Sequence, residues 1–161
     1  MSAIFSECGL FRYRLERAGL PTGIVYAYIG VNGSTAGPVR NDNTVTKWYG
    51  FTLRNKGARM IVGNLFAYCA TDVRELATAV DPVGPDNDMH LAQIIADADV
   101  LVPSWGPRAK VPKRLRYRHE GVEAMLVASG KPMKCFGLSQ SGDPLHPLML
   151  PYDTELVEWK P

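Results

Sequence analysis

The sequence predicts an α/β fold of three layers, in which helices cover both faces of a mostly parallel central sheet of about four strands plus edge strands. Two observations favour this fold. Apolar segments of strand length lie at 24–31, 60–66, 100–106 and 133–138, and most of the segments between them show helical spacing of apolar residues. Strands that alternate with helices in this way are joined by right-handed crossovers, which make neighbouring strands parallel.

Size and composition are typical of one globular domain covering residues 1–161. Apolar residues make up 46% of the chain and charged residues 21%, and the net charge of +2 favours no particular partner. Cys8, Cys69 and Cys135 form no metal-binding spacing with the histidines, so we expect reduced thiols, no metal and a cytoplasmic location. The sequence shows neither a secretory leader nor an apolar run long enough to span a membrane. We therefore expect a protein that is neither secreted nor inserted in a membrane.

The first two strands differ in pattern. Residues 11–17 alternate between apolar and charged side chains, with Arg12, Arg14 and Glu16 on the charged face. This alternation predicts a strand at a sheet edge with one face in water. Residues 24–31 are apolar on both faces, as is typical of a central strand that helices cover on both sides.

Capping residues mark the next two helices. A helix is expected after Asp42, because an Asp can cap it and apolar residues then recur every three or four positions. A buried strand follows at 60–66. After it, Thr71 or Asp72 can cap a short helix, and Glu75 is placed to complete a capping box with Asp72.

The acidic, proline-containing loop 81–88 leads into another helix. Asp86 and Asp88 resemble a paired carboxylate site, but their place just before a helix favours capping and compensation of the helix dipole. The strand at 100–106 contains Pro103, so its ladder is expected to end near Val102.

The last third of the chain is predicted to hold three more elements. A long basic helix is expected over 110–129, a fourth central strand over 133–138, and a final edge strand over 155–159. The fourth strand is followed by a polar loop.

Four segments leave the carboxyl ends of the predicted strands, and ligands of such sheets bind at that edge. These segments are 32–37, 64–69, 104–107 and 139–146, and we expect them to be neighbours in space. They contain most of the candidate site residues.

The segment after the first central strand offers Asn32, Ser34 and Thr35, with Gly30 and Gly33 keeping side chains out of the way. An Asn amide both donates and accepts, which suits a nucleobase edge or a bound water. The alternative is a loop whose Asn and Ser satisfy their own turn. The segment matches neither the Walker phosphate loop nor the GxGxxG dinucleotide fingerprint, so no cofactor is expected.

Other polar and aromatic residues are candidates at the same edge. His146 is a candidate general acid or oxyanion donor, and the alternative is a histidine that fixes its loop. Trp105 is a candidate for stacking on a flat ligand, against the commoner role of a core tryptophan. Asn64 is a candidate substrate-binding residue. His90 and His119 are interpreted as structural or surface residues.

Lys110, Arg114 and Arg118 are four residues apart and would form one row on the predicted basic helix. Such a row can follow a phosphate backbone and release counterions. The alternative is a solvated helix face opposite Glu120 and Glu123.

An ordered set of motifs resembles a known family. It consists of Asn32-Gly33-Ser34-Thr35-Ala36, Asn64-Leu65-Phe66-Ala67, the loop 81–88, Trp105-Gly106 and His146-Pro147-Leu148. Over residues 13–150 the chain is similar to the bacterial and phage family catalogued as domain of unknown function "sixteen forty-three". That resemblance implies a family but no activity.

The chain has a second, shorter resemblance. Gly30-Val31-Asn32-Gly33 and His146-Pro147 are similar to the two active-site motifs of the uracil-DNA glycosylase superfamily, although Gly33 and Leu148 replace that superfamily's proline and serine. The resemblance implies a fold of that superfamily, in which Asn32 positions a water and His146 stabilises a leaving base. Trp105 would then stack on the flipped base.

The leading hypothesis is therefore a glycosylase-like domain that acts on or recognises a nucleobase or nucleotide in DNA, as a hydrolase or other base-modifying enzyme. A non-catalytic nucleotide- or protein-binding module of phage or mobile-element origin is the alternative. An enzyme acting on a small phosphorylated metabolite is a third possibility.

Overall fold

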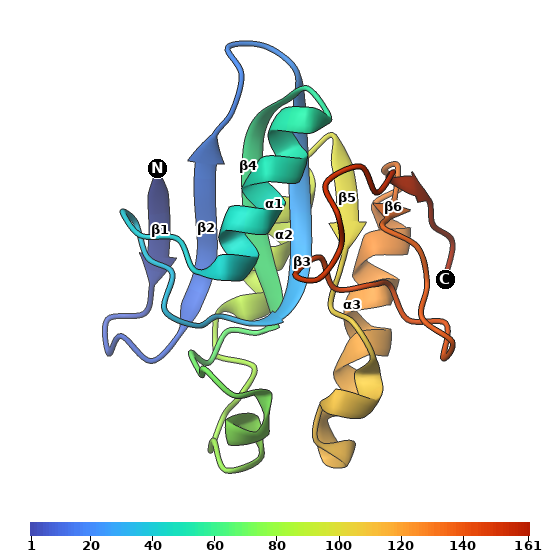
Figure 1. Cartoon of the computed structure of the whole chain (residues 1–161). Coiled ribbons are helices and arrows are strands. Elements are labelled where there is room, and N and C mark those ends of the chain that lie inside the picture. The colour runs from blue at the N-terminus through green and yellow to red at the C-terminus, as the bar shows by residue number, and fades with distance from the viewer.

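The computed structural model describes residues 1–161 and has a five-stranded sheet at its centre, in the order β1-β2-β4-β3-β5 (Figure 1). Its strands are β1 (Ser2–Phe5), β2 (Arg12–Ala18), β3 (Ile24–Asn32), β4 (Gly57–Phe66) and β5 (Val100–Pro103). The central strand β3 runs parallel to both β4 and β5, whereas β2 is antiparallel to β1 and to β4.

The α/β class is confirmed, but the expectation of a mostly parallel sheet is wrong, because the sheet is mixed. The reason lies in the short segment 19–23 between β2 and β3. Two parallel strands need a crossover of roughly a dozen residues or more between them. Because this link is much shorter, β3 runs opposite to β2. Strand β4 then inserts between them, parallel to β3.

Strand β2 lies inside the sheet and not at its edge, because β1 covers its outer side. Its expected water-facing side is also wrong: Arg12 and Arg14 are 2% and 7% exposed, and Glu16 is half-buried. Alternation identifies which side chains share a face, but not whether other parts of the chain cover that face.

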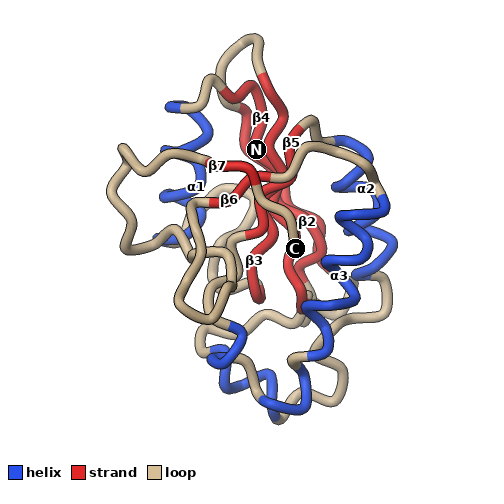
Figure 2. The backbone as a smooth tube through the Cα atoms, turned by 90° about the vertical axis from the view of Figure 1, so that its right-hand side faces the viewer, coloured by secondary structure: helices blue, strands red, loops and turns tan.

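Three helices form the outer layers. Figure 2 shows α1 (Asn43–Arg54) on one face of the sheet and α2 (Asn87–Asp97) and α3 (Tyr117–Ala128) on the other. Asp42 caps α1 as predicted, because its side chain accepts the Val45 N–H. The capping box of Asp72 and Glu75 is also present, on the 3-10 turn Val73–Ala77. No helix has the length and hydropathy needed to cross a bilayer.

The period of two along β3 divides the core between the two faces. Ala27 and Ile29 join an 18-residue cluster with residues of α2 and α3. Tyr26 and Tyr28 join a 12-residue cluster with residues of α1. As predicted from its pattern, β3 is buried on both sides, and its carboxyl end is thereby held rigidly between two packed layers.

The long basic helix predicted over 110–129 is wrong. The chain instead forms two 3-10 turns, Arg108–Lys110 and Lys113–Leu115, and α3 begins only at Tyr117. Pro112 explains the interruption, because a proline inside a helix removes one hydrogen bond and clashes with the preceding turn.

The predicted strands over 133–138 and 155–159 are much shorter than expected. Met133 makes one parallel bridge with Leu101, and the two-residue β6 (Lys134–Cys135) pairs antiparallel with β7 (Val157–Glu158) in a separate small sheet. Gly137 has a φ of +107°, which ends the extended conformation. The fourth strand therefore does not extend the central sheet.

Candidate functional site

A cavity of about 840 Å³ opens at the carboxyl end of β3. Its volume lies within the roughly 300–1,000 Å³ that is usual for small-molecule sites. Its walls come from several distant parts of the chain: Arg12 of β2 and residues within 31–35, 42–48, 70–73, 105–110 and 146–148. The next two strands of the chain, β4 and β5, lie on opposite sides of β3. In open α/β sheets a binding crevice forms at the carboxyl end of a strand in this position.

The cavity brings together six of the residues predicted from sequence: Asn32, Ser34, Thr35, Trp105, Lys110 and His146. The segments after β3 and β5 and the 139–146 loop therefore converge as expected. The segment 64–69 does not line the cavity, and residues 70–73 contribute to its wall instead. Gly30, Gly33, Asn64, Arg114 and Arg118 also lie outside the lining.

Asn32 is fixed in one orientation. Its Nδ2 donates to the carbonyl oxygens of Gly33 at 2.9 Å and Ala70 at 2.7 Å. Two carbonyl neighbours accept only from the NH₂ end of the amide, which settles which end faces them. The remaining polar atom, Oδ1, makes no hydrogen bond within the protein. Asn32 therefore presents an oriented acceptor to the cavity.

His146 has a defined proton arrangement. Its Nδ1 accepts the N–H of Leu148 at 3.3 Å, so in the neutral ring the proton is on Nε2. Burial lowers the pKa of His146, the charge of Lys110 lowers it further, and Asp42 acts in the opposite direction. At neutral pH the ring is therefore uncharged, and its Nε2–H is a hydrogen-bond donor.

Gly106 allows His146 to lie close to the chain after β5. It has a φ of +73°, and a Cβ at this position would come 3.2 Å from the Cβ of His146. Its N–H donates to the carbonyl of Pro144 at 2.9 Å. Glycine therefore serves here both to adopt the left-handed conformation and to admit the histidine.

Two tryptophans line the cavity, and both are held by the protein. Trp48 of α1 is 3% exposed, donates from Nε1 to Ser104 Oγ at 3.0 Å, and has its ring centroid 6.4 Å from that of His146. Trp105 is 2% exposed and packs edge-on against His119 and Trp159 in the larger core cluster. Trp105 is thus chiefly a core residue.

Gly30 lies close to the lining residue Trp48 and to the buried Asn64. A Cβ on Gly30 would meet the Trp48 ring at 2.8 Å and Asn64 Oδ1 at 2.9 Å. Asn64 itself is 2% exposed. The absence of a side chain at Gly30 therefore allows the Trp48 ring to take its position, and Asn64 is a buried neighbour of Gly30.

The structure does not form the predicted row of Lys110, Arg114 and Arg118. Lys110 lies in the first 3-10 turn and lines the cavity, whereas Arg114 lies in the second and donates to the Ala77 carbonyl. Arg118 is 7% exposed and is bound by the Leu65 carbonyl and by Asp88. Because the three residues do not share one helix, they cannot follow a phosphate backbone as a single line.

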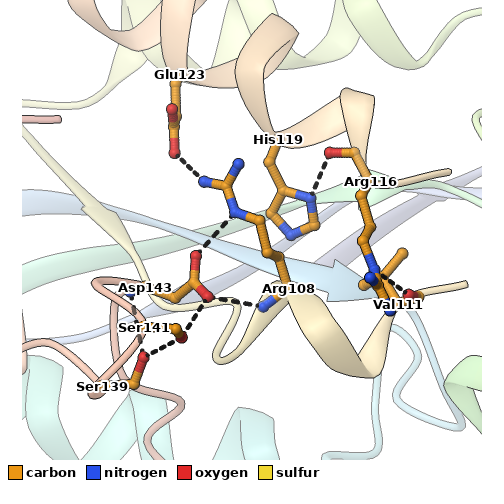
Figure 3. A network of polar contacts seen from close by, with 8 residues as sticks. All are labelled: Arg108, Val111, Arg116, His119, Glu123, Ser139, Ser141 and Asp143. Carbon is orange, nitrogen blue, oxygen red and sulfur yellow. Dashed lines mark hydrogen bonds and ion pairs between the residues drawn. The ribbon is translucent and has the colours of Figure 1, made fainter. Parts of the chain in front are cut away.

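A polar network holds the segment that carries Trp105 and Lys110 (Figure 3). Arg108 binds Asp143 through its backbone N–H and its Nε, each at 2.9 Å, and Glu123 through Nη2 at 2.9 Å. Burial alone would raise the pKa of Asp143, but the hydrogen bonds from Arg108 and Ser141 outweigh it and lower that pKa. The network ties the cavity wall to α3 and to the 139–146 loop.

The same network surrounds His119. Its Nδ1 lies 3.1 Å from the Arg116 carbonyl, and burial lowers its pKa. His119 is fully buried, as expected of a structural histidine, and does not line the cavity. His90 stacks on Tyr13 with ring centroids 4.7 Å apart.

Comparison with protein-family models gives one match, to the family described as "Protein of unknown function (DUF1643)", over residues 12–148. The chain belongs to this family. The match confirms the first resemblance drawn from the motifs. It covers nearly the whole sheet, all three helices and the cavity lining.

Searches of curated proteins and of solved structures each gave no match. The likeness to the uracil-DNA glycosylase superfamily stays a prediction. The description of the DUF1643 family names no activity.

Sequence reasoning missed three charged residues of the cavity in this DUF1643 member. Arg12 was placed on a face in water, and Asp42 and Asp72 were given only capping roles, yet all three line the cavity. Asp42 had a signal, since a cap of the helix that follows the glycine loop lies at the same sheet edge. Arg12 had none, because its burial depends on how the distant segment 33–42 folds over β2.

No group of three or more His, Cys, Asp or Glu side chains is arranged to hold a metal ion.

Proposed function

We propose that the cavity binds a nucleobase and that Asn32 and His146 promote hydrolysis of its N-glycosidic bond. The observation that carries the proposal is an oriented acceptor, Asn32 Oδ1, and a donor, His146 Nε2–H, in the lining of one cavity. A water molecule held by an acceptor and a base oxygen that receives a hydrogen bond are the two requirements of this reaction.

The reaction joins the water oxygen to C1′ of the sugar, while the bond from C1′ to the base nitrogen breaks and its electron pair leaves with the base. Asn32 orients the water but cannot take its proton, which passes to solvent. The leaving base carries a developing negative charge. His146 donates a hydrogen bond to a base oxygen, and the base takes up a proton as it is released.

A neutral histidine suits this role. Its lowered pKa keeps the ring uncharged at neutral pH, and the Leu148 N–H at Nδ1 fixes the donor on Nε2. Protonation of Nδ1 would break that contact with Leu148. Such a histidine is arranged to stabilise an anion that forms during the reaction without first binding one in the ground state.

The direct test is base release. Purified protein is incubated with pyrimidine and purine deoxynucleotides, free and within single- and double-stranded oligonucleotides, and free base is measured by chromatography. We expect release with the wild type and a loss of at least about 100-fold with His146→Ala, as for removal of one oxyanion donor. Lys113→Gln is the matched control, because Lys113 is exposed and does not line the cavity.

Two results would refute hydrolysis. In the first, free base is absent with every substrate and no nucleotide binds. In the second, free base is also absent, but a nucleotide binds tightly and His146→Ala leaves this binding unchanged. The second result would identify a non-catalytic binding module.

A nucleic-acid partner is the alternative to a free nucleotide, and it is tested separately. Of the basic residues in 108–118, Lys110 and Lys113 form neither a side-chain hydrogen bond nor an ion pair, so they are the ones available to phosphates. Fluorescence anisotropy of labelled DNA at two salt concentrations should show binding that weakens with salt and is lost in the Lys110→Glu, Lys113→Glu double variant. Equal binding by this variant, or none at low salt, would remove DNA as the partner.

A further inference from the structure

Arg12 is a buried cation whose hydrogen-bonding capacity is largely unused. Its residue is 2% exposed, and the guanidinium lines the cavity. One of its five N–H groups is bonded, from Nη1 to the Ala36 carbonyl at 2.9 Å. Nε and Nη2 make no hydrogen bond within the protein, and Arg12 takes part in none of its ion pairs.

The other buried arginines are satisfied. Arg14 binds carboxylates of Glu16 and Asp97 at 2.5 and 2.7 Å. Arg17 donates five hydrogen bonds, four of them to backbone carbonyls and one to the Asn41 side chain. Arg118 binds Asp88 and the Leu65 carbonyl. Arg12 alone among the four lacks both a carboxylate and a full set of acceptors.

The acids of the cavity form no ion pair with Arg12. Asp42 Oδ1 accepts the Val45 N–H at 2.8 Å, and both carboxylate oxygens of Asp72 bind Arg74. Burial lowers the pKa of Arg12, with Cys69 and Asp42 acting against the shift. A buried charge without a partner is costly. An anion that enters the cavity would give Arg12 the opposite charge and the hydrogen-bond acceptors that no protein group provides.

The surroundings of the guanidinium favour a phosphate. Gly33 lies flat against it, since a Cβ on Gly33 would come 3.2 Å from both Cζ and Nε of Arg12. The hydroxyls of Ser34 and Thr35 follow directly in the chain and line the same cavity, which also receives Lys110. A guanidinium edge, hydroxyl donors and an ammonium are the groups that bind phosphate oxygens.

We propose that Arg12 binds the phosphate of a nucleotide, which makes a nucleoside monophosphate the substrate class of the cavity. The nucleoside part of this assignment rests on the proposed function, but the anion site does not. A terminal phosphate fits better than a polynucleotide backbone. The chain of a polynucleotide would have to continue past a nearly fully buried side chain, and most basic residues of 108–118 are tied up by internal contacts.

Isothermal titration calorimetry with inorganic phosphate, deoxyuridine and deoxyuridine 5′-monophosphate tests the assignment. We expect the monophosphate to bind the wild type more tightly than deoxyuridine does. Arg12→Gln should raise its Kd by roughly 10- to 100-fold, because it removes charge-assisted hydrogen bonds. Arg12→Lys should keep part of the affinity, and Lys160→Gln, which removes an exposed cation outside the cavity, should keep all of it.

Folding of each variant is checked by circular dichroism and thermal melting, and phosphate should raise the Tm of the wild type but not that of Arg12→Gln. The inference is overturned if phosphate and the monophosphate bind the wild type and Arg12→Gln equally, or if neither binds the wild type. An oligonucleotide that binds through Arg12 more tightly than the monophosphate overturns the terminal phosphate. If the wild type binds phosphate through Arg12 but releases no free base from any substrate, the proposed hydrolysis is refuted and the anion site is retained.

Discussion

Replacing Arg12 by methionine should stabilise the protein in the absence of ligand. The substitution keeps most of the buried side-chain volume but removes a charge that has one hydrogen bond and no ion pair. An effective desolvation penalty of several kcal/mol per buried ion is thereby relieved. The lost bond to the Ala36 carbonyl costs about 1.5–3 kcal/mol. We therefore expect a net gain of roughly 1 kcal/mol in the free energy of unfolding.

Arg17→Met is the matched comparison on the same strand. Arg17 is as buried as Arg12, at 1% exposure, but it donates to five acceptors. Its removal leaves these acceptors without their donors, and we expect a loss of at least about 3 kcal/mol. The two variants thus separate a cation held for a ligand from one that is part of the structure.

Urea unfolding followed by tryptophan fluorescence measures both changes, provided that the m-value stays constant. Phosphate at about 100 times its Kd should add roughly 2.7 kcal/mol to the stability of the wild type and little to that of Arg12→Met. The reasoning is refuted if Arg12→Met is destabilised by more than about 2 kcal/mol without ligand, because its guanidinium would then be structural.

Three further predictions concern the walls of the cavity. Gly30→Ala should cost about 1–3 kcal/mol of stability, measured by thermal melting, because the new Cβ would lie 2.8 Å from the Trp48 ring. Asn32→Asp should cost about 2 kcal/mol near pH 7, because a carboxylate replaces the donor that faces two carbonyl oxygens. Its folded pKa is raised above the unfolded value, so stability should be regained as the pH falls, and a flat pH profile would contradict this. Asp143→Asn should be less stable than the wild type by about 1–3 kcal/mol at pH 7, because it weakens the contacts with Arg108. The folded pKa of Asp143 is lowered, so this difference is present above its unfolded pKa of about 3.9 and should vanish as the pH falls below it in acid titration of unfolding.

Local patterns predicted the parts of the fold that depend on local physics. The apolar run of β3 required burial on both faces, and the cap at Asp42 required a donor one turn into α1. The segments that leave β3 and β5 meet as expected from the parallel arrangement of these strands, but the segment that leaves β4 lies outside the cavity lining. His146 lies in the same cavity as Asn32 although residues 133–138, which precede its loop, do not extend the central sheet.

The errors have identifiable causes. The length of segment 19–23 already excluded a crossover, so the antiparallel relation of β2 and β3 could have been read from it. Pro112 likewise marked a break in the basic helix. The burial of Arg12 could not have been predicted in this way. It is produced by the segment 33–42, which lies far from Arg12 in the sequence and forms no strand that pairs with β2.

The proposed function depends on contacts that no local pattern specifies. The orientation of the Asn32 amide follows from two carbonyls, one of them at Ala70, and the tautomer of His146 follows from the Leu148 N–H. Sequence reasoning placed these two residues at the edge of the sheet where the cavity opens. Their available atoms, one acceptor and one donor, became clear only from the folded arrangement.

Release of free base from a panel of deoxynucleoside 5′-monophosphates distinguishes hydrolysis from binding alone. We expect release of at least one base by the wild type and a loss of at least about 100-fold in the folded His146→Ala variant. Because burial lowers the pKa of His146, activity should decline only at a pH below the ordinary histidine pKa of about 6.5, where the neutral ring becomes protonated. Absence of free base from every member of the panel, with a folded wild-type protein, would contradict the proposed hydrolysis.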